Sequence, residues 1–128
     1  VVSEGYVPSL ESVTARRINE VLAYIEGSLD DEVSMQTAAS RLAMSPSAFS
    51  RFFHSTAGIT FSALVRRRRI ARACHLLRRT DLPVSRVADL SGYANLANFN
   101  RRFRDETGTT PSSYRKTSQA ALTGPVPD

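Results

Sequence analysis

The chain has 128 residues, of which 41% are hydrophobic, and it carries a formal net charge of +5 at pH 7. This length predicts one domain, or two very small domains that share a spacer. The single cysteine excludes an internal disulfide framework and suits a reducing compartment, and no apolar run approaches the length needed to span a membrane.

The charge is divided unevenly along the chain. Residues 1–40 hold two basic and seven acidic side chains, whereas residues 41–116 hold fifteen basic and four acidic ones. Sixteen of the seventeen basic residues are arginine. An arginine-rich segment with an acidic lead-in favours a polyanionic partner, although charge alone leaves a solvated charged face as the alternative.

The first predicted helix follows a stretch without periodicity. Residues 1–13 contain one glycine, one proline and three serines, and they are predicted to form a linker. From Arg16 to Glu26 apolar residues recur at helical spacing, and Gly27 is suited to end this helix.

Two short helices joined by a brief turn are predicted between residues 34 and 58. Ser34 is the expected N-cap of the first helix. Its inward-facing residues are expected to be Met35, Ala38, Ala39 and Leu42. Ser45 and Pro46 supply an N-cap and a first-position proline for the second helix, which Gly58 ends. This pattern predicts a helix-turn-helix.

A long central helix is predicted from Thr60, its N-cap, to Arg79, because this stretch lacks Gly and Pro and is rich in Arg, Ala and Leu. Its expected buried stripe consists of Ile70, Ala73, Cys74 and Leu77. Its length is roughly 30 Å and one turn of B-DNA is roughly 34 Å, so it is suited to hold two reading units about one groove repeat apart. The four arginines 66–69 cannot all face one partner, and Arg69 is expected to be partly buried and paired with an acid such as Asp89.

Residues 84–110 repeat the pattern of residues 35–60. Ala39 pairs with Ala88 at an offset of 49, and Phe49 pairs with Phe99 at an offset of 50, so the second turn carries one extra residue. The second unit therefore predicts another helix-turn-helix, over residues 83–108.

The turn and the helix ends of the second unit resemble those of the first unit. Gly92 occupies the turn, Asn95 caps the second helix and Gly108 ends it. The first unit has Ala43 in place of Gly92, and because a left-handed alanine costs roughly 1 kcal/mol, that turn is expected to be shaped differently. A last short helix is expected from Thr110 to Lys116, followed by a flexible tail over residues 117–128.

The second helix of each unit has the same two faces. The inward residues are expected to be Phe49, Phe52 and Phe53 in the first unit, and Phe99 and Phe103 in the second. The outward residues are expected to be Ser47, Ser50, Arg51 and His54 in the first unit, and Ala97, Asn100, Arg101 and Arg104 in the second. Small residues let a helix settle into a major groove, and Arg and Asn pair bidentately with guanine and adenine. Solvent exposure is the other interpretation, and the agreement of the two copies favours DNA.

Phosphate contacts are expected near the helix N-termini. The candidates are the N-caps Ser45 and Asn95, together with Arg66 and Arg67 of the central helix.

Three motifs together resemble the DNA-binding domain of AraC/XylS-type bacterial transcription regulators. They are GYxNxxNFNRxFRxxxGxTPxxYR from Gly92 to Arg115, MSPSAFSRFF from Met44 to Phe53, and RIARACHLL from Arg69 to Leu77. The resemblance covers Arg16 to Lys116. It implies an all-α, homeodomain-like fold of seven helices, in which two helix-turn-helix subdomains are joined by a long central helix. It also implies sequence-specific binding of double-stranded DNA in two successive major grooves, with the DNA-binding domain over residues 14–116.

The resemblance also assigns base-reading positions and partners. These positions match Ser47, Ser50 and Arg51 in the first unit, and Leu96, Ala97, Asn100 and Arg101 in the second. Leu96 and Ala97 offer no hydrogen bonds, which leaves methyl contacts to thymine. The implied setting is the bacterial cytoplasm, at the nucleoid and away from membranes, with RNA polymerase as a partner of an activator. The chain does not begin with Met, so we expect a fragment or a processed chain. The resemblance implies that an effector-sensing or dimerising domain precedes this module.

No catalytic site is predicted. His54, His75 and Cys74 share no metal-ligand spacing, and no glycine-rich phosphate loop or nucleophile elbow is present. We therefore expect no enzyme activity, metal or cofactor. Core packing is the expected role of Cys74, with redox sensing as its alternative. The alternative function is a helical protein-interaction module or a non-specific nucleic-acid-binding module.

Overall fold

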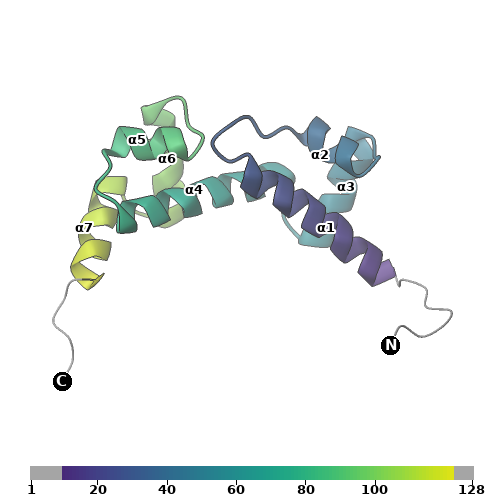
Figure 1. Ribbon diagram of the computed structural model, residues 1–128, viewed down its shortest axis with the longest axis horizontal. Coiled ribbons are helices and arrows are strands. Elements are labelled where there is room, and N and C mark those ends of the chain that lie inside the picture. Colours follow the sequence, from purple (N-terminus) through teal and green to yellow (C-terminus); the bar gives the residue numbers. More distant parts are fainter. Residues whose placement is uncertain (1–9, 123–128) are drawn as a thin grey trace, which may run out of the picture. The chain divides into compact units, whose positions relative to one another are not determined.

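The computed structural model describes residues 10–122, which contain seven α-helices and no β-strand (Figure 1). The helices are α1 (Leu10–Gly27), α2 (Met35–Arg41), α3 (Pro46–Ala57), α4 (Phe61–Arg79), α5 (Val84–Leu90), α6 (Leu96–Thr107) and α7 (Pro111–Leu122). The predicted all-α class and helix number are confirmed. The described residues divide into unit 1, residues 10–28 and 33–63, and unit 2, residues 29–32 and 64–122.

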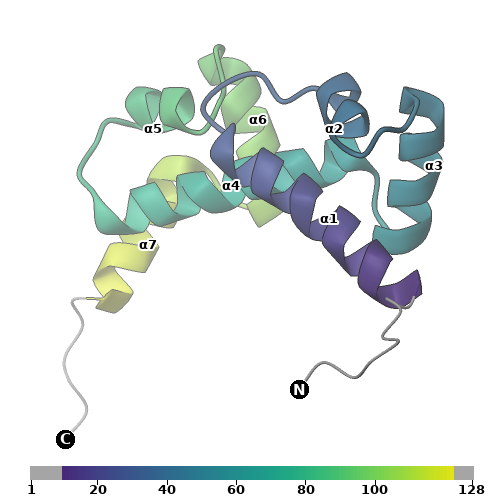
Figure 2. The ribbon, with the colours of Figure 1, turned by 45° about the vertical axis from the view of Figure 1, so that its right-hand side comes forward.

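Unit 1 is built around three phenylalanine rings. Phe49 and Phe53 of α3 are 0% and 1% exposed, and the ring of Phe61 at the start of α4 meets both of them edge-on, with centroids 5.5 and 5.8 Å away. Burying each such side chain contributes roughly 1.5–3 kcal/mol. Ala38 and Ala39 of α2 are fully buried, which permits the close packing of α2 on α3 seen in Figure 2.

The first helix begins earlier than the sequence predicted. α1 starts at Leu10, so the expected linker over residues 1–13 is wrong for residues 10–13, and residues 1–9 lie outside the described part. Val13 and Thr14 are half-buried, because they continue the apolar side of α1 by one turn. Met35 is a further correction, since it is 37% exposed at the first position of α2 instead of facing inward.

The turn of unit 1 has the same backbone form as that of unit 2, contrary to expectation. Ala43 has a φ of 55° and Gly92 has a φ of 89°. In unit 1 the Met44 amide donates to the Ala39 carbonyl, and at the matching positions of unit 2 the Tyr93 amide donates to the Ala88 carbonyl, both at 2.9 Å. Packing of the two helices therefore outweighs the roughly 1 kcal/mol cost of a left-handed alanine.

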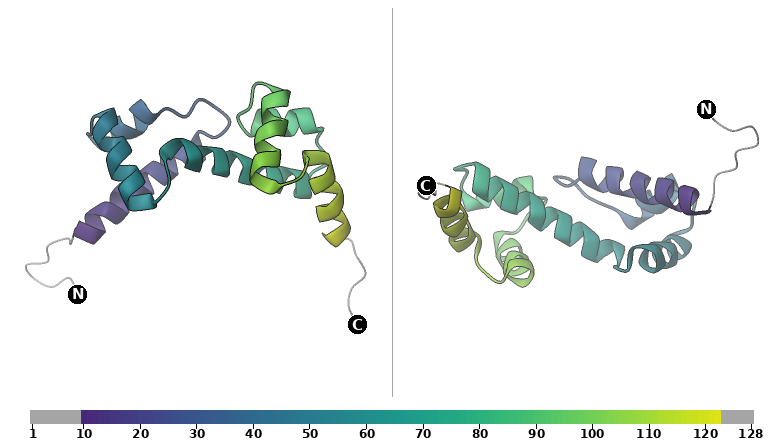
Figure 3. Two further views of the ribbon diagram at one scale, coloured as in Figure 1. Left: turned by 180° about the vertical axis from the view of Figure 1, so that it is seen from behind. Right: turned by 90° about the horizontal axis from the view of Figure 1, so that it is seen from below.

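Unit 2 repeats the arrangement of a short helix, a turn and a longer helix in α5 and α6 (Figure 3). Three residues of α4 enter its core, and we call Ile70, Ala73 and Leu77 the core stripe. The other members of this core are Val87, Ala88, Tyr93, Phe99 and Phe103, with Cys74 packed against it. Core packing of Cys74 is thus confirmed.

The last helix is longer than predicted. α7 continues to Leu122, so residues 117–122 are helical and not part of a flexible tail, while residues 123–128 lie outside the described part. The Gln119 amide donates to the carbonyls of Leu77 and Thr80, and Arg115 also donates to that of Leu77. These carbonyls lie at the end of α4, where helices leave such groups without intrahelical donors, so α7 is tied to α4.

A short segment between α1 and α2 belongs to unit 2. Arg69 of α4 donates to the carbonyl of Asp31 at 3.0 Å and to that of Gly92 at 3.3 Å. Arg69 is half-buried as expected, but the predicted pairing with Asp89 is wrong, since the guanidinium donates to backbone carbonyls instead of a carboxylate. Each Nη atom of this guanidinium donates to one carbonyl, whereas its buried Nε atom has no hydrogen-bond partner among the described residues.

No helix in the described part of the chain has both the length and the apolar character needed to cross a membrane.

Candidate nucleic-acid interface

The exposed face of α3 is set by its cap and its core anchors. Ser45 accepts a hydrogen bond from the Ala48 amide at 3.2 Å, and Pro46 starts the helix. Burial of Phe49 and Phe53 fixes the rotation of α3, because residues three and four apart share a face. The structure therefore brings four base-reading candidates together on one exposed face: Ser47, Ser50, Arg51 and His54.

α6 is built in the same way. Asn95 accepts from the Asn98 amide at 2.9 Å, Phe99 and Phe103 are fully buried, and Gly108 ends the helix with a φ of 79°. The remaining candidates all lie on its exposed surface: Leu96, Ala97, Asn100, Arg101 and Arg104. Leu96 is 44% exposed, so its methyl groups are accessible at the first position of α6.

The two faces differ at their central arginines. Arg101 donates from Nη2 to Oδ1 of Asn98, three residues earlier, at 2.8 Å. The position matching Asn98 in unit 1 is Ala48, so Arg51 has no such neighbour and makes no hydrogen bond or ion pair with the described residues. Sequence reasoning missed Asn98, although its i, i+3 spacing from Arg101 is the signal for such a pair.

The phosphate candidates lie in three places. Ser45 and Asn95 are exposed at the N-termini of α3 and α6, where backbone N–H groups and the helix dipole favour anions. Arg67 is exposed on α4, whereas Arg66 is half-buried.

The turn of unit 2 lies in a cationic environment. Burial raises the pKa of Tyr93, and the positive charges of Arg69, Arg102 and Arg66 oppose that rise. The half-buried Arg66 therefore lies close enough to this turn to act on it electrostatically, and Arg102 is a second cation there that the sequence did not single out.

The chemistry of a metal or nucleophilic site is not assembled in residues 10–122. No group of three or more His, Cys, Asp or Glu side chains there is placed to hold a metal ion. Burial raises the pKa of the Cys74 thiol, with a hydrogen bond from Tyr114 and the charge of Arg78 acting against it. A raised pKa lowers the thiolate fraction and hence the reactivity of Cys74.

Comparison with known proteins gives the same architecture. A family model described as a helix-turn-helix domain matches residues 38–117. The regulatory protein PocR of Salmonella typhimurium is 32% identical over 100 residues, which are 78% of this chain and 33% of PocR. The chain spans less than half the length of the curated relatives that it first matches.

Two solved structures have the same fold. The DNA-binding domain of AdpA, a global transcriptional factor solved in complex with a target DNA, matches with a TM-score of 0.77 and 28% identity. The match covers 85% of this chain and 98% of that one. A transcriptional regulator from Chromobacterium violaceum, of the proteins containing an AraC-type DNA-binding domain, matches with a TM-score of 0.78 and 19% identity over 90% of this chain and 99% of that one.

Proposed function

The chain belongs to the AraC/XylS family of helix-turn-helix proteins, and from this premise we propose that it binds double-stranded DNA at specific sequences and regulates transcription. The observation that carries the proposal is the repeated exposed face of α3 and α6. Each begins with a capped N-terminus, continues with small or polar residues and reaches an arginine one turn later. The agreement of the two copies favours a shared binding role over a surface that is only solvated.

Base reading is assigned residue by residue. Arg51 and Arg101 are suited to guanine, and Asn100 is suited to adenine, because these side chains match the paired groups on the base edges in the major groove. The hydroxyl groups of Ser47 and Ser50 can donate hydrogen bonds to base edges or accept hydrogen bonds from them, so they suit more than one base. His54 and Arg104 extend the reading faces toward their C-terminal ends. Leu96 and Ala97 make methyl contacts with thymine.

Phosphate binding positions the protein. The N-termini capped by Ser45 and Asn95 approach phosphates with their backbone N–H groups, and Arg66 and Arg67 add charge contacts. Each cation that neutralises a phosphate releases counterions, so affinity falls steeply with salt.

Selection of bound fragments from random duplex DNA tests this proposal. We expect an enriched motif with two half-sites about 10 base pairs apart, which is the spacing of successive major grooves on one side of the duplex. Arg51→Ala is expected to erase base preference in one half-site and Arg101→Ala in the other, each with a loss of roughly 1–3 kcal/mol. Selection without an enriched motif would contradict sequence-specific binding and leave the non-specific alternative.

The whole protein is proposed to be a bacterial cytoplasmic regulator that acts at the nucleoid. We propose that an effector-sensing domain precedes residue 1 and that RNA polymerase is a partner if the protein activates. Relatives such as PocR are longer than this chain, which leaves room for such a further domain. Catalysis has no part in this proposal. In vitro transcription from a promoter that carries the selected motif tests activation, and no change in transcript level on addition of the full-length protein would refute a regulatory role.

A further inference from the structure

α4 carries a row of basic side chains that the proposed reading faces do not use. Arg72, His75 and Arg79 lie at positions i, i+3 and i+7 of this helix. With 3.6 residues per turn, the three residues lie within about 50° of the direction opposite to the core stripe. His75 and Arg79 are exposed and Arg72 is half-buried. We call these three residues the α4 cationic ridge.

The ridge has no balancing charge in its own helix. α4 contains no Asp or Glu, whereas a solvated surface helix gains stability from acidic residues spaced three or four positions from its cations. Arg72 and Arg79 make no hydrogen bond or ion pair with the residues that the structure describes. The acidic residues next in sequence, Asp81 and Asp89, are exposed. Like charges on one helix face repel, so the ridge costs stability that a polyanion would restore.

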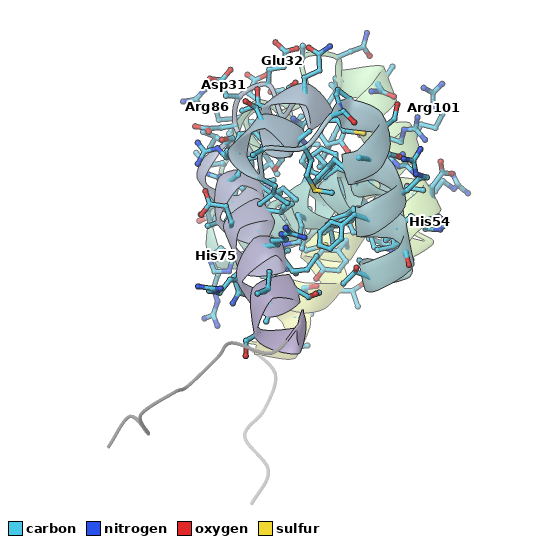
Figure 4. All side chains as sticks on the ribbon, turned by 90° about the vertical axis from the view of Figure 1, so that its right-hand side faces the viewer. Asp31, Glu32, His54, His75, Arg86 and Arg101 are labelled. Atoms are coloured by element: carbon cyan, nitrogen blue, oxygen red, sulfur yellow. The ribbon has the colours of Figure 1, made fainter. Side chains whose placement is uncertain are left out.

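The ridge faces away from the reading face of α6. Within unit 2 the core stripe of α4 and the phenylalanines of α6 enter the same core, so the exposed sides of the two helices point away from it in different directions. Figure 4 shows this for two labelled residues of unit 2, since His75 and Arg101 lie at opposite edges of the view. A duplex held against Arg101 therefore does not reach the ridge.

We propose that the α4 cationic ridge binds the phosphate backbone of a second DNA duplex, so that one molecule bridges two duplexes. Arginine suits phosphate because its planar guanidinium donates in pairs to anionic oxygens. Apart from the single imidazole of His75, the ridge contains no aromatic side chain, so it lacks the series of rings on which successive unpaired bases stack, which favours duplex over single-stranded nucleic acid. It spans roughly 10 Å along α4 and offers no group that reads base edges, so its binding is independent of sequence.

A capture experiment tests the ridge in the 128-residue chain. One duplex that carries the selected motif is immobilised, and a fluorescent duplex of unrelated sequence is added with the protein. We expect the wild type to capture the second duplex. Because two phosphate contacts are lost, Arg72→Ala/Arg79→Ala is expected to lower capture roughly tenfold and to reduce the slope of log K against log salt by about 2. Arg79 is exposed, Arg72 is half-buried without a hydrogen bond to the described residues, and alanine is a strong helix former, so the variant is expected to fold.

Matched variants separate the ridge from total charge and from the reading faces. Arg16→Ala/Lys116→Ala removes the same charge from exposed positions elsewhere and is expected to leave capture unchanged. Arg72→Lys/Arg79→Lys keeps the charge and is expected to retain most of it. The ridge proposal is overturned if the wild type captures no second duplex, or if Arg72→Ala/Arg79→Ala captures it as well as the wild type. It is also overturned if Arg72→Ala/Arg79→Ala weakens binding to the motif duplex when no second duplex is present. Loss of motif binding in Arg101→Ala, by contrast, tests only the proposed function.

Discussion

Replacing Gly92 by alanine tests how tightly the turn of unit 2 is enclosed. Gly92 has a φ of 89°, and a Cβ atom added there would lie 2.2 Å from the Leu29 carbonyl oxygen and 2.9 Å from Nε of Arg69. The left-handed backbone alone costs a residue with a side chain roughly 1–2 kcal/mol. The collision with a backbone oxygen forces the segment from Leu29 to Glu32 to move, at the roughly 1–3 kcal/mol typical of overpacking. We therefore expect Gly92→Ala to destabilise the protein by about 2–5 kcal/mol.

Gly58 supplies the matched control. It also has a positive φ, of 73°, but a Cβ atom there would meet nothing within 4 Å. Gly58→Ala should therefore cost only the backbone term, roughly 1–2 kcal/mol. Urea denaturation followed by far-UV circular dichroism measures both free energies of unfolding. Equal losses of stability in Gly58→Ala and Gly92→Ala would refute the close approach of the Leu29 carbonyl to the turn.

Four further changes test other contacts. Ala43→Gly should stabilise the chain by up to about 1 kcal/mol in the same denaturation assay, because glycine relieves the left-handed backbone, and a loss of stability would contradict this. Asn98→Ala should weaken base discrimination in the half-site read by Arg101 and leave the other half-site unchanged in a selection experiment; equal effects on both would show that Asn98 does not position Arg101. Gln119→Ala should lower the thermal midpoint by a few degrees, since it removes donors worth about 0.5–1.5 kcal/mol each from the end of α4, and an unchanged midpoint would count against that tie. Alkylation of Cys74 at pH 8 should be slower in the folded than in the urea-unfolded protein and should accelerate as pH rises, because burial raises the pKa of the thiol; equal rates would mean that the thiol is not shielded.

Features that depend on a few neighbouring residues could be predicted from the sequence. The expected N-caps Ser34, Ser45 and Asn95 each accept a hydrogen bond from the amide three residues later. Thr60 and Thr110 do the same. The buried phenylalanines followed from helical periodicity, and so did the exposure of the reading faces, because rotation of a helix about its axis is set by its apolar side.

Features that depend on distant residues could not be predicted. α7 continues past Lys116 because Gln119 reaches carbonyls about forty positions earlier in the chain, and no local signal announces such a bond. The partner of Arg69 was wrong for the same reason, since Asp31 lies 38 positions away. Ala43 is a different case. The cost of about 1 kcal/mol for its left-handed backbone was correctly recognised from the sequence, but the packing energy of the two helices is larger than this cost. The DNA contacts of the site residues stay predictions until bases are placed against them.

The inclusion of residues 29–32 in unit 2 has a consequence for biosynthesis. Leu29 and Asp31 are synthesised long before Gly92. Their carbonyls can therefore pack against the turn of unit 2 only after the intervening residues have been translated. A recombinant fragment cut at residue 64 never receives them, and its Arg69 guanidinium loses one of its two acceptors. A fragment that contains the second helix-turn-helix is therefore expected to be less stable when it lacks residues 29–32, although these residues precede the first helix-turn-helix in the gene.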